Sequence, residues 1–297
     1  HLCDHLVQQG HEVTVVDDFS SGSRENLSAI SDRIRVFDLA IDSISSIASE
    51  LAGTTRIYHL AALISGYDSL YDPDAYVKTN IDGFSRVLEL AKELENPRII
   101  FASSSTVYGN QPDPEMSEST PPNPQSMYAL TKLTGEHMLA MYQELYGYNY
   151  VCLRLFNVYG PRQSPNHPYA NVTCKFSYAA AHGDGVRLYG DGKQSRDFVY
   201  VEDVVQALLA VSETSDDTIY NVGTGEDASI AGLLEAVQGL AKAPLPVEQC
   251  PPWPNDIQAI RANINRLASE KGYRPTVSLQ DGLAQTVAYF RGLHEQS

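Results

Sequence analysis

Short apolar runs alternate, in the first half of the chain, with longer segments in which apolar residues recur every three or four positions. The short runs predict buried strands, and the longer segments predict amphipathic helices. The expected strands occupy residues 11–17, 33–38, 56–62, 98–104 and 151–157. The clearest expected helices occupy residues 82–94 and 128–147, with Gly147 placed to end the second. Because strands that alternate with helices form parallel sheets, the pattern predicts an α/β fold with a Rossmann-like, doubly wound sheet.

The second half of the chain has a different pattern. Residues 161–196 are rich in proline, glycine, asparagine and tyrosine, and the segments after residue 221 are short and interrupted by prolines. Between them, residues 197–213 return to the compact pattern of the first half. We therefore expect two domains, the first formed by residues 1–160 and 197–220, and a smaller, discontinuous α/β domain formed by residues 161–196 and 221–297. Ligands of open α/β sheets bind at the carboxyl ends of the strands, so we expect the site there.

Composition narrows the classes of function. The 297 residues are 43% apolar, enough for a sizeable core, and no stretch approaches the roughly 20 apolar residues of a membrane span. Without such a span or a secretory signal, the expected location is cytoplasmic and no membrane partner is expected. A net charge of −16 disfavours nucleic acid as a partner. The four cysteines have no paired spacing, so neither a metal site nor a disulfide framework is expected.

The start of the chain resembles a dinucleotide-binding unit entered partway through. His1–Gly10 has the pattern of the end of a helix, and the strand that follows ends at Asp17. An acidic residue at this place can accept hydrogen bonds from an adenosine ribose. The glycine-rich phosphate loop that accompanies it would precede His1, and we expect it in the native protein. Without that loop, an acidic residue here is more often an ordinary polar strand end, and this is the alternative interpretation of Asp17.

Tyr128 and Lys132 open the helix expected at 128–147, four residues apart and therefore on one face. A neighbouring ammonium favours the phenolate of a tyrosine, which can then take a proton from a sugar hydroxyl while hydride leaves the same carbon. One such spacing can arise by chance in a chain with 18 tyrosines. A second pair, Tyr189 and Lys193, brackets two glycines and is expected in a turn. The helical context therefore selects Tyr128 and Lys132.

Three serines, Ser103 to Ser105, end the expected strand at 98–104. A hydroxyl at this edge can relay a proton between a substrate oxygen and a tyrosine. The alternative is that these serines only cap the following turn.

Five motifs carry a resemblance over nearly the whole chain: FASSSTVYG, SMYALTK, LRLFNVYGPR, DFVYVEDV and YNVGTG. Together they resemble the extended short-chain dehydrogenase/reductase family and, within it, the nucleotide-sugar 4-epimerases. The resemblance implies an NAD-dependent isomerase that acts on a UDP-hexose. It implies oxidation at C4 to a transient 4-keto sugar, followed by return of the hydride to the other face.

The resemblance also implies roles for individual residues. Tyr128 would be the base, Lys132 its electrostatic partner and a ligand of the nicotinamide ribose, and Ser104 the hydroxyl relay. The further cofactor-binding residues would be Asp17, Asp18, Ser21, Gly22, Asp38, Leu39, Leu60, Ala61, Ala62 and Asn80. The substrate-binding residues would be Ser104, Ser105, Thr106, Asn157, Val172, Tyr189, Arg196 and Asp256. For Asn157 and Tyr189, packing or turn formation is the alternative interpretation.

Differences from related patterns bear on the substrate. Sugar dehydratases carry an acidic pair where this chain has Ser105 and Thr106, and neither residue can act as a general acid. The family's late Arg-Pro-Gly-Asp turn reads Trp253-Pro254-Asn255-Asp256 here, so an indole replaces a charge that would reach the diphosphate. Ile260 occupies what resembles the family's position whose size governs access of N-acetylated sugars, and its intermediate size leaves the outcome open.

Two further readings of function stay open at this point. The chain could be another nucleotide-sugar epimerase or a decarboxylase, or a non-catalytic NAD-binding regulatory protein. For assembly, the resemblance implies a homodimer through a four-helix bundle built from residues 82–94 and 128–146. The apolar residues Met138, Met141 and Leu145 fit that interface, but they fit an ordinary core equally well.

Overall fold

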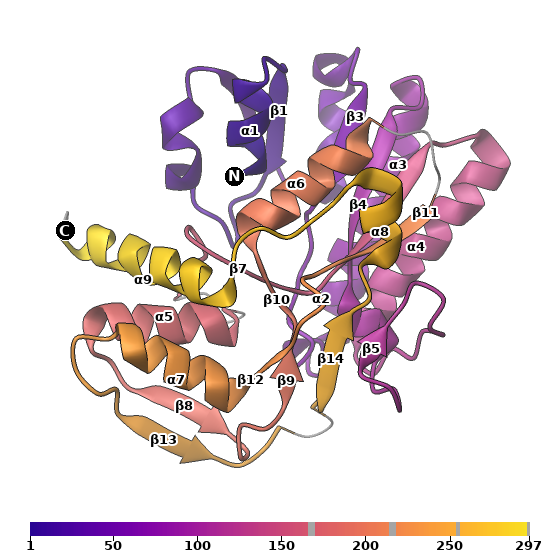
Figure 1. The fold of residues 1–297 in the computed structure, drawn as a ribbon. Helices are drawn as coiled ribbons and strands as arrows, with labels where there is room; N and C mark the ends of the chain where they lie inside the picture. The colour runs from indigo at the N-terminus through magenta and orange to yellow at the C-terminus, as the bar shows by residue number, and fades with distance from the viewer. Residues whose placement is uncertain (166–169, 214–217, 254–255, 296–297) are drawn as a thin grey trace. The chain divides into compact units, whose positions relative to one another are not determined.

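The computed structural model describes residues 1–165, 170–213, 218–253 and 256–295, and the chain divides into two compact units (Figure 1). Unit 1 comprises His1–Gly109, Pro122–Arg154 and Leu208–Tyr220, and unit 2 comprises Asn110–Pro121, Leu155–Ala207 and Asn221–Ser297. These bounds differ from the predicted domains, because residues 110–121, 155–160 and 197–207 belong to unit 2. The reason is strand pairing: each of these segments contributes a strand to a ladder of unit 2.

Parallel strands form the framework of unit 1. β1 (Val13–Asp17) pairs in parallel with β2 (Ile34–Asp38). A four-stranded sheet has the order β11-β6-β4-β3, and its strands are β3 (Arg56–His59), β4 (Arg98–Ser104), β6 (Tyr150–Leu155) and β11 (Thr218–Val222). All seven residues of β4 are buried, as the continuous apolar run predicted for a strand covered on both faces.

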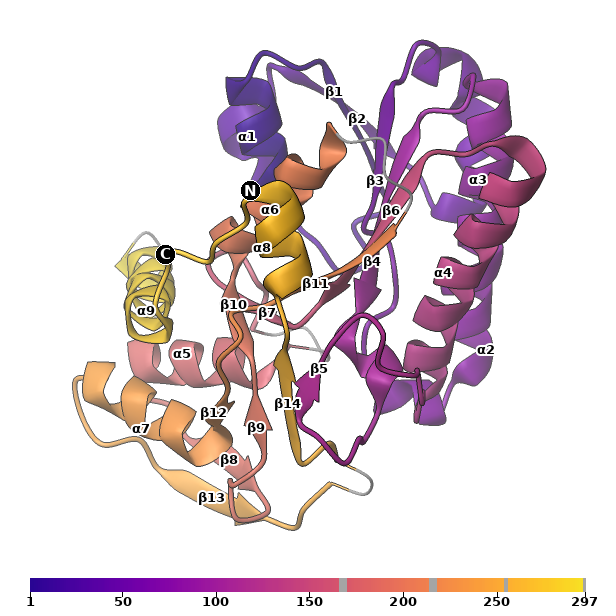
Figure 2. The ribbon, with the colours of Figure 1, turned by 45° about the vertical axis from the view of Figure 1, so that its right-hand side comes forward.

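Helices α3 (Gly83–Glu93) and α4 (Met127–Tyr146) run along the β3–β4–β6 sheet (Figure 2). Their apolar faces enclose a core that includes Phe84, Leu88, Ile99 and Phe101. α4 comes very close to β4, since a Cβ atom at Gly135 would lie 2.4 Å from the Phe101 ring. The remaining helical segments are α1 (Leu2–Gln8), η1 (Arg24–Ile30), η2 (Ile41–Leu51), η3 (Asp68–Leu70), α2 (Pro73–Tyr76), η4 (Val77–Asp82) and η5 (Ser105–Tyr108).

The described residues of unit 2 form three small sheets. One has the order β12-β9-β14-β5, one pairs β10 with β7 and one pairs β13 with β8. Its strands are β5 (Glu115–Met116), β7 (Asn157–Tyr159), β8 (Val186–Tyr189), β9 (Ser195–Arg196), β10 (Phe198–Tyr200), β12 (Ala228–Ser229), β13 (Val247–Cys250) and β14 (Ala259–Ala262). Only β12 and β9 pair antiparallel among the ladders recorded in this unit.

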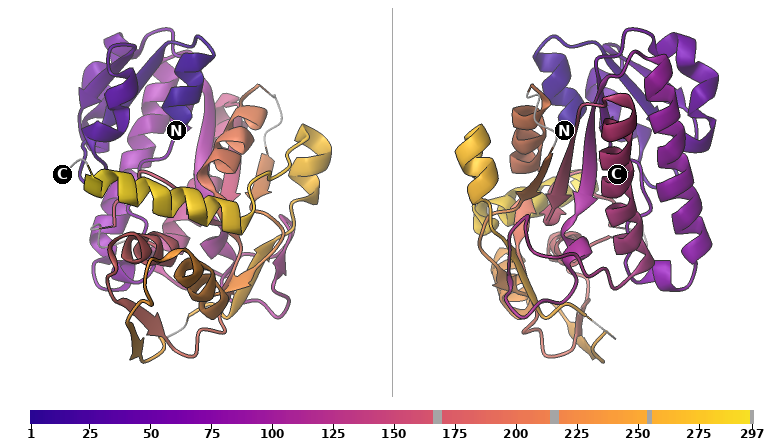
Figure 3. Two further views of the ribbon diagram at one scale, coloured as in Figure 1. Left: turned by 60° about the vertical axis from the view of Figure 1, so that its left-hand side comes forward. Right: turned by 90° about the vertical axis from the view of Figure 1, so that its right-hand side faces the viewer.

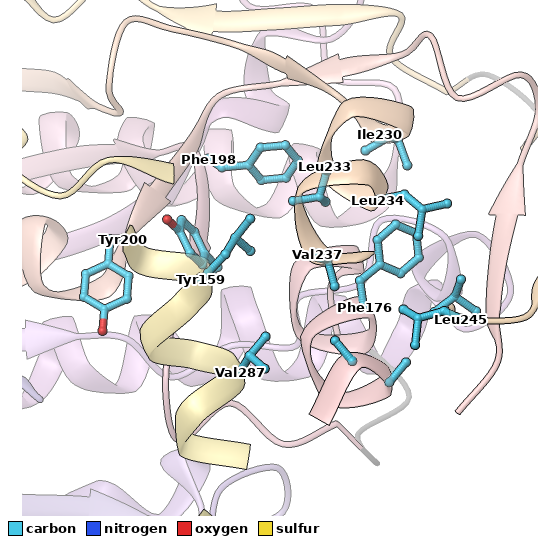
Figure 4. Packing of buried hydrophobic residues seen from close by; sticks show 14 residues of the cluster. Tyr159, Phe176, Phe198, Tyr200, Ile230, Leu233, Leu234, Val237, Leu245 and Val287 are labelled. Carbon is cyan, nitrogen blue, oxygen red and sulfur yellow. The ribbon is translucent and has the colours of Figure 1, made fainter. Parts of the chain in front are cut away.

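Helices α5 (Val172–His182), α7 (Ile230–Leu240) and α9 (Leu279–Glu295) pack against one another in unit 2, and α9 is the yellow helix of Figure 3. Figure 4 shows the core beneath them, where Phe176, Leu233, Val237 and Val287 meet side chains of the short strands. The other helices are α6 (Val201–Ser212), which begins in unit 2 and ends in unit 1, and α8 (Asn265–Lys271).

The structure confirms the α/β fold class and most of the expected elements. β3 ends at His59 rather than at residue 62, and the run at 151–157 divides between β6 and β7. α4 ends at Gly147, whose φ of 71° is the left-handed conformation of a helix C-cap. Within the described residues, no helix is long and apolar enough to span a membrane, and no group of three or more potential metal ligands occurs. The cytoplasmic location stays a prediction.

Candidate active site

The carboxyl end of β4 presents the serine run that the sequence singled out. β4 ends at Ser104, whose side-chain oxygen accepts hydrogen bonds from the Thr106 amide at 3.2 Å and from the Thr106 hydroxyl at 2.9 Å. Ser103, Ser104 and Ser105 are all buried. Ser104 therefore does cap the following turn, and it also acts on Tyr128, whose pKa it lowers in opposition to burial. The two roles that the sequence left open are compatible.

Helix α4 brings Tyr128 and Lys132 to this strand end. Ser126 is its N-cap, and its hydroxyl accepts a hydrogen bond from the Ala129 amide at 3.1 Å. Tyr128 and Lys132 follow on one face and are 9% and 4% exposed. The Lys132 ammonium donates to the Ala102 carbonyl of β4 at 2.7 Å, and its nitrogen lies 6.0 Å from the centre of the Tyr128 ring. The structure thus assembles Ser104, Tyr128 and Lys132 within unit 1.

Burial controls the ionisation of this group. It raises the pKa of Tyr128, and the hydrogen bond with Ser104 only partly opposes that effect. Burial also lowers the pKa of Lys132 to about 8. Burial is thus the larger of the two influences on the pKa of Tyr128, and the effect of Lys132 on the phenolate stays a prediction.

A buried network behind the strand was missed by the sequence analysis. Glu136, one turn beyond Lys132, accepts hydrogen bonds from the Ser103 hydroxyl and from both Nε and Nη2 of Arg154, at 2.9 and 2.7 Å for the arginine. The guanidinium of Arg154 also lies 4.7 Å from the centre of the Tyr108 ring. The two ionised side chains are 3% and 4% exposed. A charged residue at a buried position of a strand, as Arg154 is in β6, was the signal that could have revealed this network.

His59 is a second residue that the sequence did not single out. It ends β3 and is stacked on Phe84 and Phe101, with ring centres 4.4 and 5.7 Å away. Burial, and secondly the charge of Lys132, lower the pKa of His59 to about 3, so the ring is neutral at physiological pH. The Lys132 ammonium lies 5.1 Å from the centre of the same Phe101 ring. The Lys132 ammonium therefore lies beside a stack of neutral aromatic rings.

The expected adenosine-binding residues cluster at the ends of β1 and β2. In the parallel register Asp17 stands opposite Asp38, and both are exposed. The Asp17 carboxylate accepts a hydrogen bond from the Phe19 amide at 2.7 Å, and the Leu39 amide donates to the Asp17 carbonyl at 3.2 Å. The turn that follows contains three further exposed residues from the prediction: Asp18, Ser21 and Gly22. Gly22 lies beside Asp17, since a Cβ atom there would be 4.0 Å from the carboxylate.

The expected residues after β3 lie in a loop that Asn80 fixes. Leu60 is 46% exposed, Ala61 is exposed and Ala62 is half-buried. Asn80 is buried and uses its whole amide within unit 1: its oxygen accepts from the Leu63 amide at 2.8 Å, and its nitrogen donates to the Leu63 carbonyl and to Thr131, both at 3.0 Å. Asn80 therefore ties this loop to α4.

These strand ends fit a dinucleotide. The exposed carboxylates of Asp17 and Asp38 can bind the hydroxyl and amino groups of adenosine, and exposed Leu60 and Ala61 offer an apolar surface along the same edge.

Most of the expected substrate residues of unit 2 lie on several of its short strands and on α5. Tyr189 ends β8 and its ring contacts Trp253, with ring centres 4.7 Å apart. Arg196 in β9 donates to the Asp256 carboxylate at 2.6 Å. Asn157 begins β7, which pairs with β10, and Val172 begins α5 and packs against the core of Figure 4. Pro254 and Asn255, part of the late turn, lie outside the described residues.

Comparison with known proteins agrees with this geometry. A model of the NAD dependent epimerase/dehydratase family matches residues 1–223. A UDP-glucose 4-epimerase of Mycolicibacterium smegmatis is 36% identical over 295 residues, which cover 98% of this chain and 94% of that protein. A UDP-N-acetyl-alpha-D-glucosaminuronate decarboxylase of Bacillus cytotoxicus is 31% identical over 304 residues, with coverages of 98% and 94%.

Among solved structures, the UDP-glucose 4-epimerase of Thermus thermophilus in complex with NAD is 34% identical, with a TM-score of 0.91 and coverages of 98% and 95%. The chain belongs to the NAD dependent epimerase/dehydratase family. Its cofactor is accordingly NAD.

Proposed function

We propose that this member of the NAD dependent epimerase/dehydratase family interconverts UDP-hexoses that differ in configuration at C4. The observation that carries the proposal is the group at the end of β4, where Ser104 and Tyr128 are both buried and the Lys132 ammonium, on the same face of α4 as Tyr128, lies 6.0 Å from the centre of the Tyr128 ring. Hydroxyls held in this way can move the proton of a sugar alcohol while its carbon is oxidised. The similarity to UDP-glucose 4-epimerases supports the choice of substrate class.

In this mechanism, bound NAD would supply the acceptor, and then the donor, for the hydride of C4. Tyr128 takes the proton of the C4 hydroxyl as the carbon is oxidised and gives it back on reduction. Because burial raises the pKa of Tyr128, its hydroxyl is protonated in the free protein and must lose that proton through Ser104 or to solvent first. Lys132, 6.0 Å from the ring centre, stabilises the negative charge that develops.

Dehydration is disfavoured by the residues that follow Ser104. Loss of water from the sugar needs a general acid, and Ser105 and Thr106 have none to offer. Ser105 is buried, and the Thr106 hydroxyl is engaged with Ser104. Decarboxylation is the second candidate, because three relatives that are each 31% identical carry decarboxylase names.

Binding of the cofactor and binding of the substrate are divided between the two units in this proposal. Unit 1 would bind NAD through Asp17, Asp38 and the loop after β3, with Lys132 at the nicotinamide ribose. Unit 2 would bind the UDP-sugar, with Arg196 facing the diphosphate and Tyr189 and Asp256 beside it. Arg196 is suited to this because it is 13% exposed and already oriented by Asp256, so little side-chain freedom is lost on binding.

The test is to incubate the full-length protein with NAD and, separately, UDP-glucose, UDP-N-acetylglucosamine and UDP-glucuronate, following the sugar protons by NMR. We expect the C4 epimer of one of them to appear, and deuterated water to leave its carbon-bound hydrogens unexchanged. A pentose product from UDP-glucuronate would identify a decarboxylase instead. No change with any of the three would count against the proposal.

We also propose that the protein is a homodimer joined through α3 and α4. Four apolar side chains on the outside of α4 are exposed in the single chain by 44–61%: Leu130, Met141, Leu145 and Tyr146. A second copy that covers them would form a four-helix bundle. Sedimentation at micromolar concentration should give twice the chain mass, and the double change Met141→Asp, Leu145→Asp should give the monomer. Val247→Asp, at an exposed position of unit 2, is the matched control, and a monomeric wild type would refute the dimer.

A further inference from the structure

The buried ion pair of unit 1 contacts the chain on both sides of Ser104. Glu136 of α4 accepts a hydrogen bond from the hydroxyl of Ser103, the residue that precedes Ser104 in β4. Arg154 of β6 donates two hydrogen bonds to the same carboxylate, at 2.9 and 2.7 Å. The Arg154 guanidinium also lies 4.7 Å from the centre of the Tyr108 ring, at the end of the η5 segment that follows Ser104. One ion pair therefore holds both neighbouring segments of the serine.

These contacts form a closed network that begins and ends at Ser104. Within η5, Thr106 donates to the Ser104 side-chain oxygen from its amide at 3.2 Å and from its hydroxyl at 2.9 Å. The members of this Ser104 network are each joined to the next by the backbone of β4 or η5 or by a side-chain contact: Ser104, Thr106, Tyr108, Arg154, Glu136 and Ser103. All of them except Thr106 are buried. Because a closed, buried network leaves few ways to move, the orientation of the Ser104 hydroxyl depends on each link.

The same ion pair fixes α4 on the sheet. Glu136 is bound to β4 through Ser103 and to the neighbouring strand β6 through Arg154. Tyr128, Lys132 and Glu136 follow one another at intervals of four residues, so they lie along one side of the helix. All three are buried. Holding α4 on two strands at Glu136 therefore also determines where Tyr128 lies relative to the end of β4.

The energetics of a buried ion pair favour a role in orientation. The desolvation of two charges opposes their attraction, so such a pair often adds little net stability compared with apolar side chains of similar size. Both oxygens of the Glu136 carboxylate are already bound: Oε1 accepts from Ser103 and from Nε of Arg154, and Oε2 accepts from Nη2 of Arg154. At 3–4% exposure the pair is closed to a substrate. Exact placement of a reacting hydroxyl, by contrast, matters greatly, since an error of about 1 Å can cost roughly 100-fold in rate.

We propose that Glu136 and Arg154 are positioning residues that hold the Ser104 hydroxyl in place for proton transfer. They act through Ser103 on one side of Ser104 and through Tyr108 on the other, and they do not touch the substrate. This inference rests on the proposed function for the reaction that Ser104 serves. Opening the Ser104 network should lower kcat and leave KM for the UDP-sugar unchanged, because the interaction that is lost matters only as the proton moves.

Ser103→Ala opens the network on the β4 side, because it removes one hydroxyl and leaves the ion pair intact. In the NAD-loaded, full-length protein we expect kcat to fall roughly 10- to 100-fold. In a Ser104→Ala background the same change should alter kcat by less than about 2-fold, since no hydroxyl is then left to orient. An equal loss in both backgrounds would show a purely structural effect and would overturn the proposal. An unchanged kcat, or a change confined to KM, would overturn it as well.

Arg154→Lys opens the network on the β6 side. Lysine keeps a positive charge beside Glu136, but it lacks the planar fork that holds both carboxylate oxygens and faces the Tyr108 ring. We expect the same pattern as for Ser103→Ala, with a lower kcat, an unchanged KM and no further loss in the Ser104→Ala background. Ser212→Ala, which removes a buried hydroxyl at the end of α6, is the matched control and should change neither constant. Losses that simply add to that of Ser104→Ala, in variants that circular dichroism shows to be folded, would contradict the proposal.

A measurement without substrate separates this inference from the proposed function. The Thr106 amide is bound to the Ser104 oxygen, so its hydrogen exchange, followed by NMR, reports how firmly Ser104 is held. We expect this exchange to be faster in Ser103→Ala than in wild type and unchanged in Ser212→Ala. Faster exchange without turnover of any UDP-sugar by the wild type would support the positioning of Ser104 while contradicting the epimerase. Turnover by the wild type, with Thr106 exchange unchanged in Ser103→Ala, would leave the epimerase and overturn the positioning role.

Discussion

Two edges of unit 1 are assigned to one cofactor, yet they are built in opposite ways. At the end of β4, Ser104, Tyr128 and Lys132 are buried, and behind them the ion pair of Glu136 and Arg154 is 3–4% exposed. At the ends of β1 and β2, the ion pair of Arg24 and Asp38 has both side chains 58% exposed. The nitrogen–oxygen distances are similar, at 2.7 and 2.6 Å. Similar contacts thus lie in very different surroundings.

The two surroundings suit two different tasks, which are the positioning of reacting groups at the buried edge and the attachment of the cofactor at the open edge. Buried groups are fixed before any ligand arrives, because an unpaired polar group there costs far more than one in water. Such fixed geometry is what proton and hydride transfer need. In the proposed function the open edge holds an adenosine and performs no chemistry, so water and salt can screen its charges without loss of function. Changes at the buried edge should therefore have large effects and changes at the open edge small ones.

The largest expected effect is that of Tyr128→Phe. Removing the hydroxyl removes the proton acceptor, and we expect turnover of the UDP-sugar to fall roughly 10²- to 10⁴-fold. The phenyl ring preserves the packing of α4 on β4, so thermal unfolding should stay close to that of wild type. The rate of sugar epimerisation measured by NMR checks the loss of turnover, and thermal unfolding followed by circular dichroism checks that the fold is preserved. Activity within a few-fold of wild type would refute the assignment of the base.

Next in size is Glu136→Ala, which leaves the Arg154 guanidinium buried without its carboxylate. Breaking a buried pair from one side costs about 3–5 kcal/mol, and urea unfolding should show a loss of that size. Glu136→Gln keeps the shape of the side chain and one of its two acceptor oxygens. We therefore expect it to lose less stability than Glu136→Ala. A loss of under about 1 kcal/mol for Glu136→Ala would mean that this buried ion pair contributes no more to stability than an exposed ion pair does.

The features that could be predicted from the sequence are those set by residues close together along the chain. Tyr128 and Lys132 share a face because helical spacing requires it, and Asp17 ends a strand because the apolar run ends there. The serine run likewise lies at the end of β4. These local relations hold whatever the rest of the fold does, so motif spacing was sufficient to find them.

Contacts between distant segments were not predictable in this way. Glu136 meets Ser103 across 33 positions and Arg154 across 18, and no local pattern selects those partners. The burial of His59 depends on Phe84 and Phe101 from α3 and β4. The effect of Lys132 on Tyr128 was expected from proximity alone, whereas the pKa of Tyr128 is set mainly by how deeply the pair is buried, which only the fold determines.

His59 gives an effect of intermediate size that appears only in acid. Burial lowers its pKa to about 3, while the unfolded chain takes up the proton near pH 6.5. Between these values the unfolded state binds more protons, so the stability associated with His59 falls as pH drops, by about 1.4 kcal/mol per pH unit. His59→Phe should flatten the decline of the urea midpoint between pH 6.5 and pH 4 relative to wild type. Parallel curves for the two proteins would show that His59 is not held neutral by burial.

The smallest expected effect tests the open edge. Arg24 bridges to Asp38 and stacks on Phe19, with the guanidinium carbon 4.4 Å from the ring centre, yet both partners of the ion pair are more than half exposed. Water solvates both charges in the folded and unfolded states alike, so Arg24→Ala should lower the unfolding free energy by at most about 1 kcal/mol, and by less in high salt. Urea unfolding at low and high salt measures this, with Glu136→Ala beside it as the buried counterpart. A loss comparable to that of Glu136→Ala, unchanged by salt, would mean that the β1–β2 edge is as rigidly organised as the catalytic one, and the contrast between positioning and attachment would fail.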